Sequence, residues 1–246
     1  MKVGTDGILL GAWVSCEGAG KLLDIGTGSG LIALMAAQRC AAGGDRRFHI
    51  TAIDIDADAA GQATENFAAS PWADCLTALP VSLADFLAAG HAGEYDVIVC
   101  NPPYYITGKS IIPAGAQRSA ARRDADLTID DVLQAAAVLL APSGRLALIL
   151  PTAREEDLLA ACARAGMRIV RRCLVATTPR KAPSRLLVEV AREVAVLPAK
   201  GNCAANTVVY SPSNWPGSIR KAGQDGETYL TIGSEEFKTL TGDFYL

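Results

Sequence analysis

The sequence has little histidine, no excess of positive charge and no paired cysteines. With only two histidines in 246 residues, His49 and His91, it offers few candidates for a histidine-based catalytic triad. Lysine and arginine total 23 against 26 acidic residues, so the net charge of −3 excludes a globally basic nucleic-acid binder but allows a local basic patch. The seven cysteines are an odd number without a C-x-x-C pair, which argues against a disulfide framework or a zinc site.

Long hydrophobic runs are also missing. No apolar run reaches the roughly 18 residues of a membrane-spanning helix, and the start lacks the charged and apolar regions of a secretory signal. Half of the residues are nevertheless hydrophobic and 20% are charged, which predicts a substantial core. We therefore expect a soluble, cytoplasmic monomer with reduced thiols and no metal.

Strand-like and helix-like segments alternate along most of the chain. Strands are predicted over 21–25, 48–55, 76–83, 95–103 and 144–151, and helices over 31–42, 56–69, 128–141 and 153–166. This order predicts one α/β domain over residues 1–246, with a mostly parallel sheet covered by helices on both faces. The β-rich runs 167–178 and 184–196 have no helix between them, so they are predicted to pair antiparallel.

A glycine-rich turn, "LDIGTGSG", joins the first predicted strand to the first predicted helix. Gly26, Gly28 and Gly30 allow the backbone to approach a ligand beside a helix N-terminus, and Asp54 ends the next strand, where it can bind ribose hydroxyls. A dinucleotide would bring its phosphates close to the Asp24 carboxylate. S-adenosylmethionine carries an ammonium and a sulfonium and no phosphate, and it suits Asp24 better.

A second motif, "VIVCNPPYY", ends the strand predicted over 95–103. Two adjacent prolines remove two backbone donors and fix φ at both positions, and they push Asn101 away from helical geometry. The chain must therefore leave the strand as a stiff, extended turn that holds Asn101 and Tyr104 at its rim.

Together these motifs resemble the class I S-adenosylmethionine-dependent methyltransferases. That resemblance implies a Rossmann-like, seven-stranded sheet whose last strands are antiparallel. The opening "MKVGTDGILLGAW", "NPPYY" and the closing "FKTLTGDFYL" resemble more closely the tRNA1(Val) adenine-37 N6-methyltransferase family. Members of that family usually carry a further short β segment before "MKVGTD", which this sequence does not show.

The resemblance implies roles for the residues of the "NPPY" motif. The Asn101 side-chain oxygen and the Pro102 carbonyl would accept hydrogen bonds from the exocyclic amine of adenine. These bonds favour a pyramidal nitrogen whose lone pair points at the methyl group, so that catalysis needs positioning and electrostatics but no strong base. Tyr104 would stack on the base once it has left the loop stack.

The resemblance also extends the predicted cofactor site. Thr27 of the glycine turn and Ile55 beside Asp54 join it, and Asp85 would bind the adenine amine with Phe86 packed alongside. The alternative for the last two is a helix-capping aspartate and a core phenylalanine. Lys2, Thr5 and Asp6 would close over the methionine end of the cofactor, with an ordinary polar turn as the alternative.

Two arginine-rich segments are candidates for contacts with tRNA phosphates. One follows the "NPPY" motif and the other lies between the two last predicted strands, and a solvated charged surface is the alternative for both. The candidates are Arg118, Arg122, Arg123, Arg180, Lys181 and Arg185.

Other functions are compatible with parts of this pattern. A protein-glutamine N5-methyltransferase also presents "NPPY" to a planar amide, but it carries an N-terminal helical domain for which this sequence has no room. In guanine-N2 rRNA methyltransferases the last residue of this motif is commonly Phe, whereas here it is Tyr104. A catalytically silent RNA-binding module would not need the set of Asp24, the three glycines, Asp54 and Asn101.

Overall fold

One mixed sheet organises the computed structural model, which describes residues 4–16, 18–42, 47–102, 127–178, 180–193 and 229–231. Its strands are β1 (Lys21–Ile25), β2 (His49–Asp54), β3 (Leu76–Pro80), β4 (Tyr95–Cys100), β5 (Leu140–Pro151), β6 (Met167–Ala176), β7 (Arg185–Arg192) and β8 (Tyr229–Thr231). The helices are α1 (Thr5–Trp13), α2 (Leu31–Ala41), α3 (Ala57–Ala68), α4 (Leu83–Ala88), α5 (Ile129–Leu139) and α6 (Glu155–Ala165). The strand order is β3-β2-β1-β4-β5-β7-β6-β8.

The predicted parallel sheet and its antiparallel pair are confirmed. Strands β1 to β5 pair in parallel, whereas β7 runs antiparallel to both of its neighbours, β5 and β6. Among the described strands β7 alone is reversed, because β6 returns to the direction of β1 and β8 pairs with β6 in parallel. The short β8 adds an eighth strand beside the seven that were expected.

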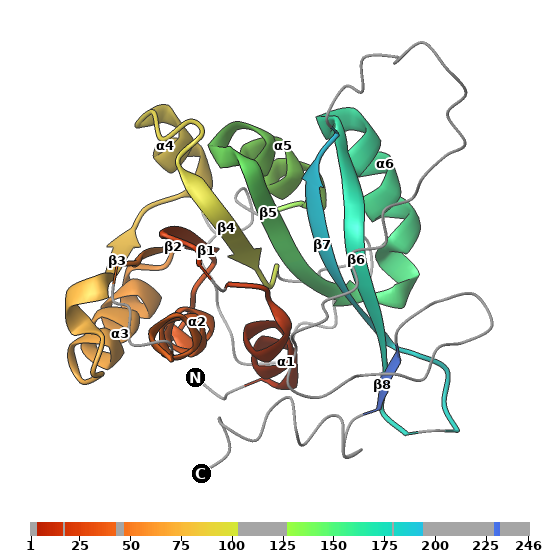
Figure 1. The fold of residues 1–246 in the computed structure, drawn as a ribbon, viewed down its shortest axis with the longest axis horizontal. Coiled ribbons are helices and arrows are strands. Elements are labelled where there is room, and N and C mark those ends of the chain that lie inside the picture. Colours follow the sequence, from red (N-terminus) through yellow and green to blue (C-terminus); the bar gives the residue numbers. More distant parts are fainter. Residues whose placement is uncertain are drawn as a thin grey trace, which may run out of the picture.

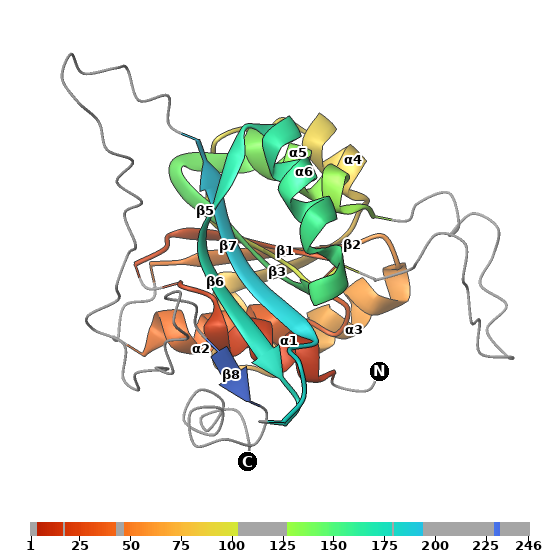
Figure 2. The same cartoon turned by 90° about the vertical axis from the view of Figure 1, so that its right-hand side faces the viewer.

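The helices form a layer on each face of the sheet, as Figure 1 and Figure 2 show. Helices α1, α2 and α3 cover one face, and α4, α5 and α6 cover the other. Each layer encloses its own hydrophobic cluster, one built around Trp13, Leu22 and Ile50 and the other around Leu133 and Leu148. Alternate residues of the central strands contribute to the two clusters, as expected for strands buried on both faces.

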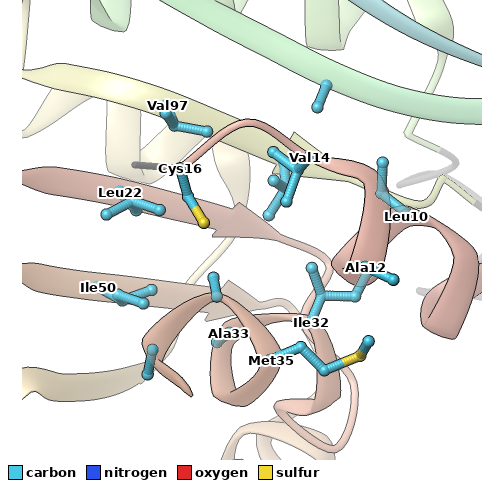
Figure 3. Packing of buried hydrophobic residues seen from close by; sticks show 14 of the residues in the cluster. Leu10, Ala12, Val14, Cys16, Leu22, Ile32, Ala33, Met35, Ile50 and Val97 are labelled. Atoms are coloured by element: carbon cyan, nitrogen blue, oxygen red, sulfur yellow. The ribbon is translucent and has the colours of Figure 1, made fainter. Parts of the chain in front are cut away.

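Helices α1 and α4 were not predicted from the sequence. Helix α1 contains two glycines, which disfavour a helix, but its tertiary contacts need one of them, Gly11. A Cβ atom on Gly11 would lie 2.7 Å from the Met35 sulfur, so glycine allows α1 and α2 to pack closely. Figure 3 shows Ala12 of α1 beside Ile32 and Met35 of α2 in this interface. The strand predicted over 76–83 is shorter than expected, because β3 ends at Pro80 and α4 begins at Leu83.

Candidate active site at the carboxyl edge of the sheet

The glycine turn after β1 folds back onto the end of β2. The backbone N–H groups of Gly26 and Thr27 both donate to the carbonyl of Ile53, at 2.9 and 3.0 Å. Gly26, Gly28 and Gly30 have φ values of 70°, 59° and 82°, in the left-handed region that favours glycine. The predicted turn geometry is therefore present, with Gly30 as the N-cap residue of α2.

Asp24 lies beneath this turn and is completely buried. The Thr27 hydroxyl donates to its Oδ2 at 2.6 Å, while its Oδ1 has no hydrogen-bond partner among the described residues. Burial raises the pKa of the Asp24 carboxyl to about 7, against the opposing effects of the Thr27 hydroxyl and of the Ala33 backbone N–H, which lies near the carboxylate without meeting the geometry of a hydrogen bond to Oδ1. A buried carboxylate oxygen without a donor is costly, and a cationic donor would compensate for that cost.

Asp54 connects the turn to the beginning of α3. Its Oδ2 accepts a hydrogen bond from Gly28 N, and its Oδ1 accepts one from Asp56 N, both at 2.9 Å. The next residue, Ile55, is a large apolar side chain with 57% of its surface exposed. The end of β2 thus presents a fixed carboxylate beside an open apolar surface.

Asn101 follows β4 directly and is adjacent to the glycine turn. Cys100 is in register with Ile25 of β1, and the next residue on each strand is Asn101 and Gly26, respectively. Neighbouring strands lie about 4.8 Å apart, so the two motifs that were predicted to share one site lie side by side. Asn101 is half-buried and Pro102 is buried.

Several predicted site residues lie outside the described residues. These are Lys2, Tyr104, Arg118, Arg122 and Arg123.

Asp85 and Phe86 belong to α4 and have local structural roles. Ser82 is the N-cap residue of this helix, its hydroxyl accepts from Asp85 N at 3.1 Å, and it also donates to Asp85 Oδ2 at 2.6 Å. Phe86 is 3% exposed and stacks on His91 with a centroid separation of 4.5 Å. The aspartate therefore takes part in capping and the phenylalanine belongs to the core, and the contact of this pair with the cofactor stays a prediction.

Asp6 and Arg185, which were predicted for different ligands, form an ion pair with each other. Arg185 Nε donates to the two Asp6 carboxylate oxygens at 2.9 and 3.1 Å. Thr5 precedes Asp6 in the first turn of α1 and is exposed. Arg180 and Lys181 are exposed in the connection between β6 and β7. Because β6 ends at the same edge as β1, these cations lie on the side of the molecule that carries the glycine turn.

A buried charge network at the far end of α1 was missed from the sequence. Glu189 of β7, 2% exposed, accepts a hydrogen bond from Ser15 N at 2.8 Å and forms an ion pair with Arg171 of β6 at 3.2 Å. The signal that was available was the one acidic residue, Glu189, within the otherwise apolar run of β7, whose residues from Leu186 to Val190 are buried.

None of the helices in the described part of the chain combines the length and the apolar composition of a membrane span. The same part of the chain contains no cluster of three or more histidine, cysteine or acidic side chains that could hold a metal ion.

Comparison with known proteins identifies the family. Residues 7–159 match the model of the methyltransferase small domain. Over 246 residues, the chain is 41% identical to a tRNA1(Val) (adenine(37)-N6)-methyltransferase of Dickeya chrysanthemi, covering 100% of this chain and 88% of the relative. This chain belongs to the tRNA1(Val) (adenine(37)-N6)-methyltransferase family.

Other similarities agree with this assignment. A family member from Phocaeicola vulgatus is 44% identical over 246 residues, which cover 100% of this chain and 91% of the relative. Among solved structures, a predicted O-methyltransferase from Agrobacterium tumefaciens superposes with a TM-score of 0.57 at 19% identity, covering 76% of this chain and 83% of the other. That similarity confirms the Rossmann-like methyltransferase fold.

The glycine turn yields a prediction about stability. A Cβ atom on Gly30 would lie 2.5 Å from Phe67 Cε1, whereas one on Gly26 would meet nothing within 4 Å. Gly26→Ala should cost about 1–2 kcal/mol of unfolding free energy from its positive φ alone. Gly30→Ala should cost about 1–3 kcal/mol more, because of the overlap. Urea unfolding of the two variants measures the difference, and equal costs would contradict the packing described here.

Asp24 yields a prediction about pH. Its pKa is raised to about 7 in the folded protein, so the folded state keeps a proton that the unfolded chain loses near pH 4. The free energy of unfolding should therefore decrease as the pH rises from about 4 to about 7, relative to Asp24→Asn, which has no proton to lose. Between about pH 5 and about pH 7 the difference between the two proteins should change by about 2 kcal/mol. Urea unfolding at several pH values measures this difference. A difference that stays constant across the range would refute the raised pKa.

Proposed function

We propose that this protein methylates the N6 amine of an unpaired adenine in tRNA, adenine 37 of tRNA1(Val), with S-adenosylmethionine as methyl donor. The observation that carries the proposal is the adjacency of Asn101 to the glycine turn, in a chain of this family. The function is that of its curated relatives. A soluble monomer in the cytoplasm, consisting of a single methyltransferase domain, is the form that we propose for the protein.

The residues around the turn fit S-adenosylmethionine. The unpaired Oδ1 of Asp24 is a buried acceptor suited to the ammonium of the cofactor. Asp54 would hold the ribose hydroxyls, and the exposed side chain of Ile55 offers an apolar surface for the adenine ring. When bound, the cofactor supplies an electrophilic methyl group on a sulfonium. A dinucleotide fits less well, since its phosphates would lie close to two carboxylates.

Asn101 and Pro102 would bind and orient the acceptor amine. The lone pair of adenine N6 is delocalised into the ring, which makes it a poor nucleophile. The Asn101 side-chain oxygen and the Pro102 carbonyl, both hydrogen-bond acceptors, would bind the two amine hydrogens and favour a pyramidal nitrogen. Pro102 is buried, its own ring restricts its φ, and the proline that follows it restricts its ψ, so its carbonyl is held in one orientation. No side chain has to take up a proton before the methyl group is transferred.

The substrate must present its adenine outside a base pair. An anticodon loop offers bases that can be splayed out without strand separation. Because the net charge of the chain is −3, affinity for tRNA must come from local cations. Arg180 and Lys181, which are exposed at the edge that bears the site, are the described candidates.

Two substitutions should separate binding from chemistry. Asn101→Ala should keep the affinity for S-adenosylmethionine and lose most methyl transfer, because Asn101 faces the acceptor amine. Asp54→Ala should instead weaken cofactor binding by roughly 1.5–3 kcal/mol, because it removes charge-assisted hydrogen bonds. Calorimetry measures the affinity of both variants for S-adenosylmethionine, and a methyl-transfer assay measures their activity. Loss of cofactor binding in Asn101→Ala would show that its role is misassigned.

The product tests the function itself. Purified protein is incubated with unmodified tRNA and isotope-labelled S-adenosylmethionine, and the digested RNA is analysed by mass spectrometry. We expect labelled N6-methyladenine beside the anticodon, and none when adenine 37 is replaced in the transcript. Labelled N2-methylguanine, or label in protein only, would refute the proposal in favour of the alternative methyltransferases.

A further inference from the structure

Helix α1 is fixed to β7 by charged contacts at both of its ends. At its start Asp6 pairs with Arg185, and just beyond its end Ser15 N donates to Glu189. Arg185 and Glu189 are four residues apart on β7, so they lie on the same face of the sheet. Four strand residues span about 13 Å, and the stretch from Asp6 to Ser15 spans about the same length when helical. The two contacts therefore match in spacing and fix the position of α1 along β7.

The contact beyond the end of α1 belongs to the core. Arg171 Nη1 donates to Trp13 O at 3.0 Å, Ser15 Oγ at 2.8 Å and Glu189 Oε1 at 3.2 Å, and its guanidinium lies 3.9 Å from the centroid of the Trp13 ring. The Glu189 side chain is 3% exposed. Removing one partner of such a network leaves an unpaired buried charge, so a single substitution here should destabilise the fold strongly.

The contact at the start of α1 is different because it is partly open to solvent. The side chains of Arg185 and Asp6 are 35% and 23% exposed, so each can be hydrated when its partner is removed. Loss of this ion pair should therefore leave the fold intact. Any change in activity that follows its removal must then come from a role other than stabilising the fold.

The first turn of α1 joins two parts of the active-site edge. On one side, a Cβ atom on the buried Gly7 would lie 3.5 Å from the side chain of Leu31, the residue that follows the glycine turn. On the other side, Arg185 begins β7, directly after the connection that carries Arg180 and Lys181. Helix α1 thus bridges the glycine turn and this basic connection, and Asp6–Arg185 is its partly exposed attachment to β7.

We propose that Asp6 and Arg185 are a positioning pair, which sets the basic connection between β6 and β7 at a fixed place relative to the glycine turn. tRNA bound by Arg180 and Lys181 then delivers its adenine to Asn101 in the correct position. Neither member of the pair touches the cofactor or the RNA. The inference rests on the proposed function, since it takes tRNA as the substrate.

The test compares Asp6→Asn, Arg185→Gln and the exchanged pair Asp6→Arg/Arg185→Asp. Each single variant should raise the KM for tRNA about five- to tenfold, with kcat and the Kd for S-adenosylmethionine within about twofold of the wild type. The exchanged pair should recover part of the loss, because it restores an ion pair with reversed polarity. The melting temperatures of the single variants should lie within about 3 °C of the wild type.

The matched control is Glu94→Gln. It breaks the Lys21–Glu94 ion pair, which is partly exposed and has an N–O distance of 2.9 Å, at the amino end of β1. This variant should leave the KM for tRNA unchanged. If Glu94→Gln raised the KM for tRNA as much as Asp6→Asn does, the inference would be overturned. The effect would then come from the loss of any surface carboxylate and not from the position of the Asp6–Arg185 pair.

Direct roles for the two residues predict other results. If Arg185 contacts a phosphate, Arg185→Gln weakens tRNA binding and lowers the slope of log K against log salt for tRNA by about one. Asp6→Asn then does not raise the KM for tRNA. If Asp6 binds the cofactor, Asp6→Asn weakens S-adenosylmethionine binding without tRNA present. Either result overturns the inference. Wild-type protein that leaves tRNA unmethylated would refute the proposed function as well, whereas an active wild type with unaffected single variants refutes the inference alone.

Discussion

The candidate site depends on how the end of β2 satisfies the backbone of the glycine turn. Three successive N–H groups, of Gly26, Thr27 and Gly28, donate to the Ile53 carbonyl and the Asp54 carboxylate. Without these acceptors, a turn with left-handed φ values would expose unpaired amides beside a buried strand end. The interaction joins two neighbouring strands and places the turn over Asp24. It also gives Asp54 a structural role beside the binding role that we propose for it.

The position of α1, whose first turn lies beside the residue that follows the glycine turn, depends on charged contacts inside the core. Arg171 and Glu189 satisfy backbone groups at the end of this helix, and Arg39 of α2 donates to the carbonyls of Gly11 and Val14. Cations at the last carbonyls of a helix agree with its dipole. Buried charges of this kind add little net stability, but they define one arrangement of the packed elements. Here the arrangement brings the first turn of α1 to the edge that carries Asn101.

The positions of some candidate site residues could be predicted from the sequence because they depend on local structure. The glycines between a strand and a helix and the acid at the end of the next strand have fixed places in any parallel α/β sheet, and the register of β1 with β4 then brings Asn101 beside the turn. For Asp85 and Phe86 the sequence left two roles open, a contact with the cofactor and the start of a helix. The structure places both residues in α4, where Phe86 packs against His91 and Tyr95, and their contact with the cofactor stays a prediction.

The sequence by itself determined the alternation of strands and helices, the glycine turn and the antiparallel pair, because these depend on periodicity and on the backbone preferences of a few residues. Tertiary structure decided the existence of α1, whose glycines are unfavourable until Met35 packs against one of them. It also decided that Asp6 and Arg185 meet, although they lie at opposite ends of the described chain. Contacts of this kind leave no periodic signal, since the pairing of distant charges depends on which elements the sheet brings together.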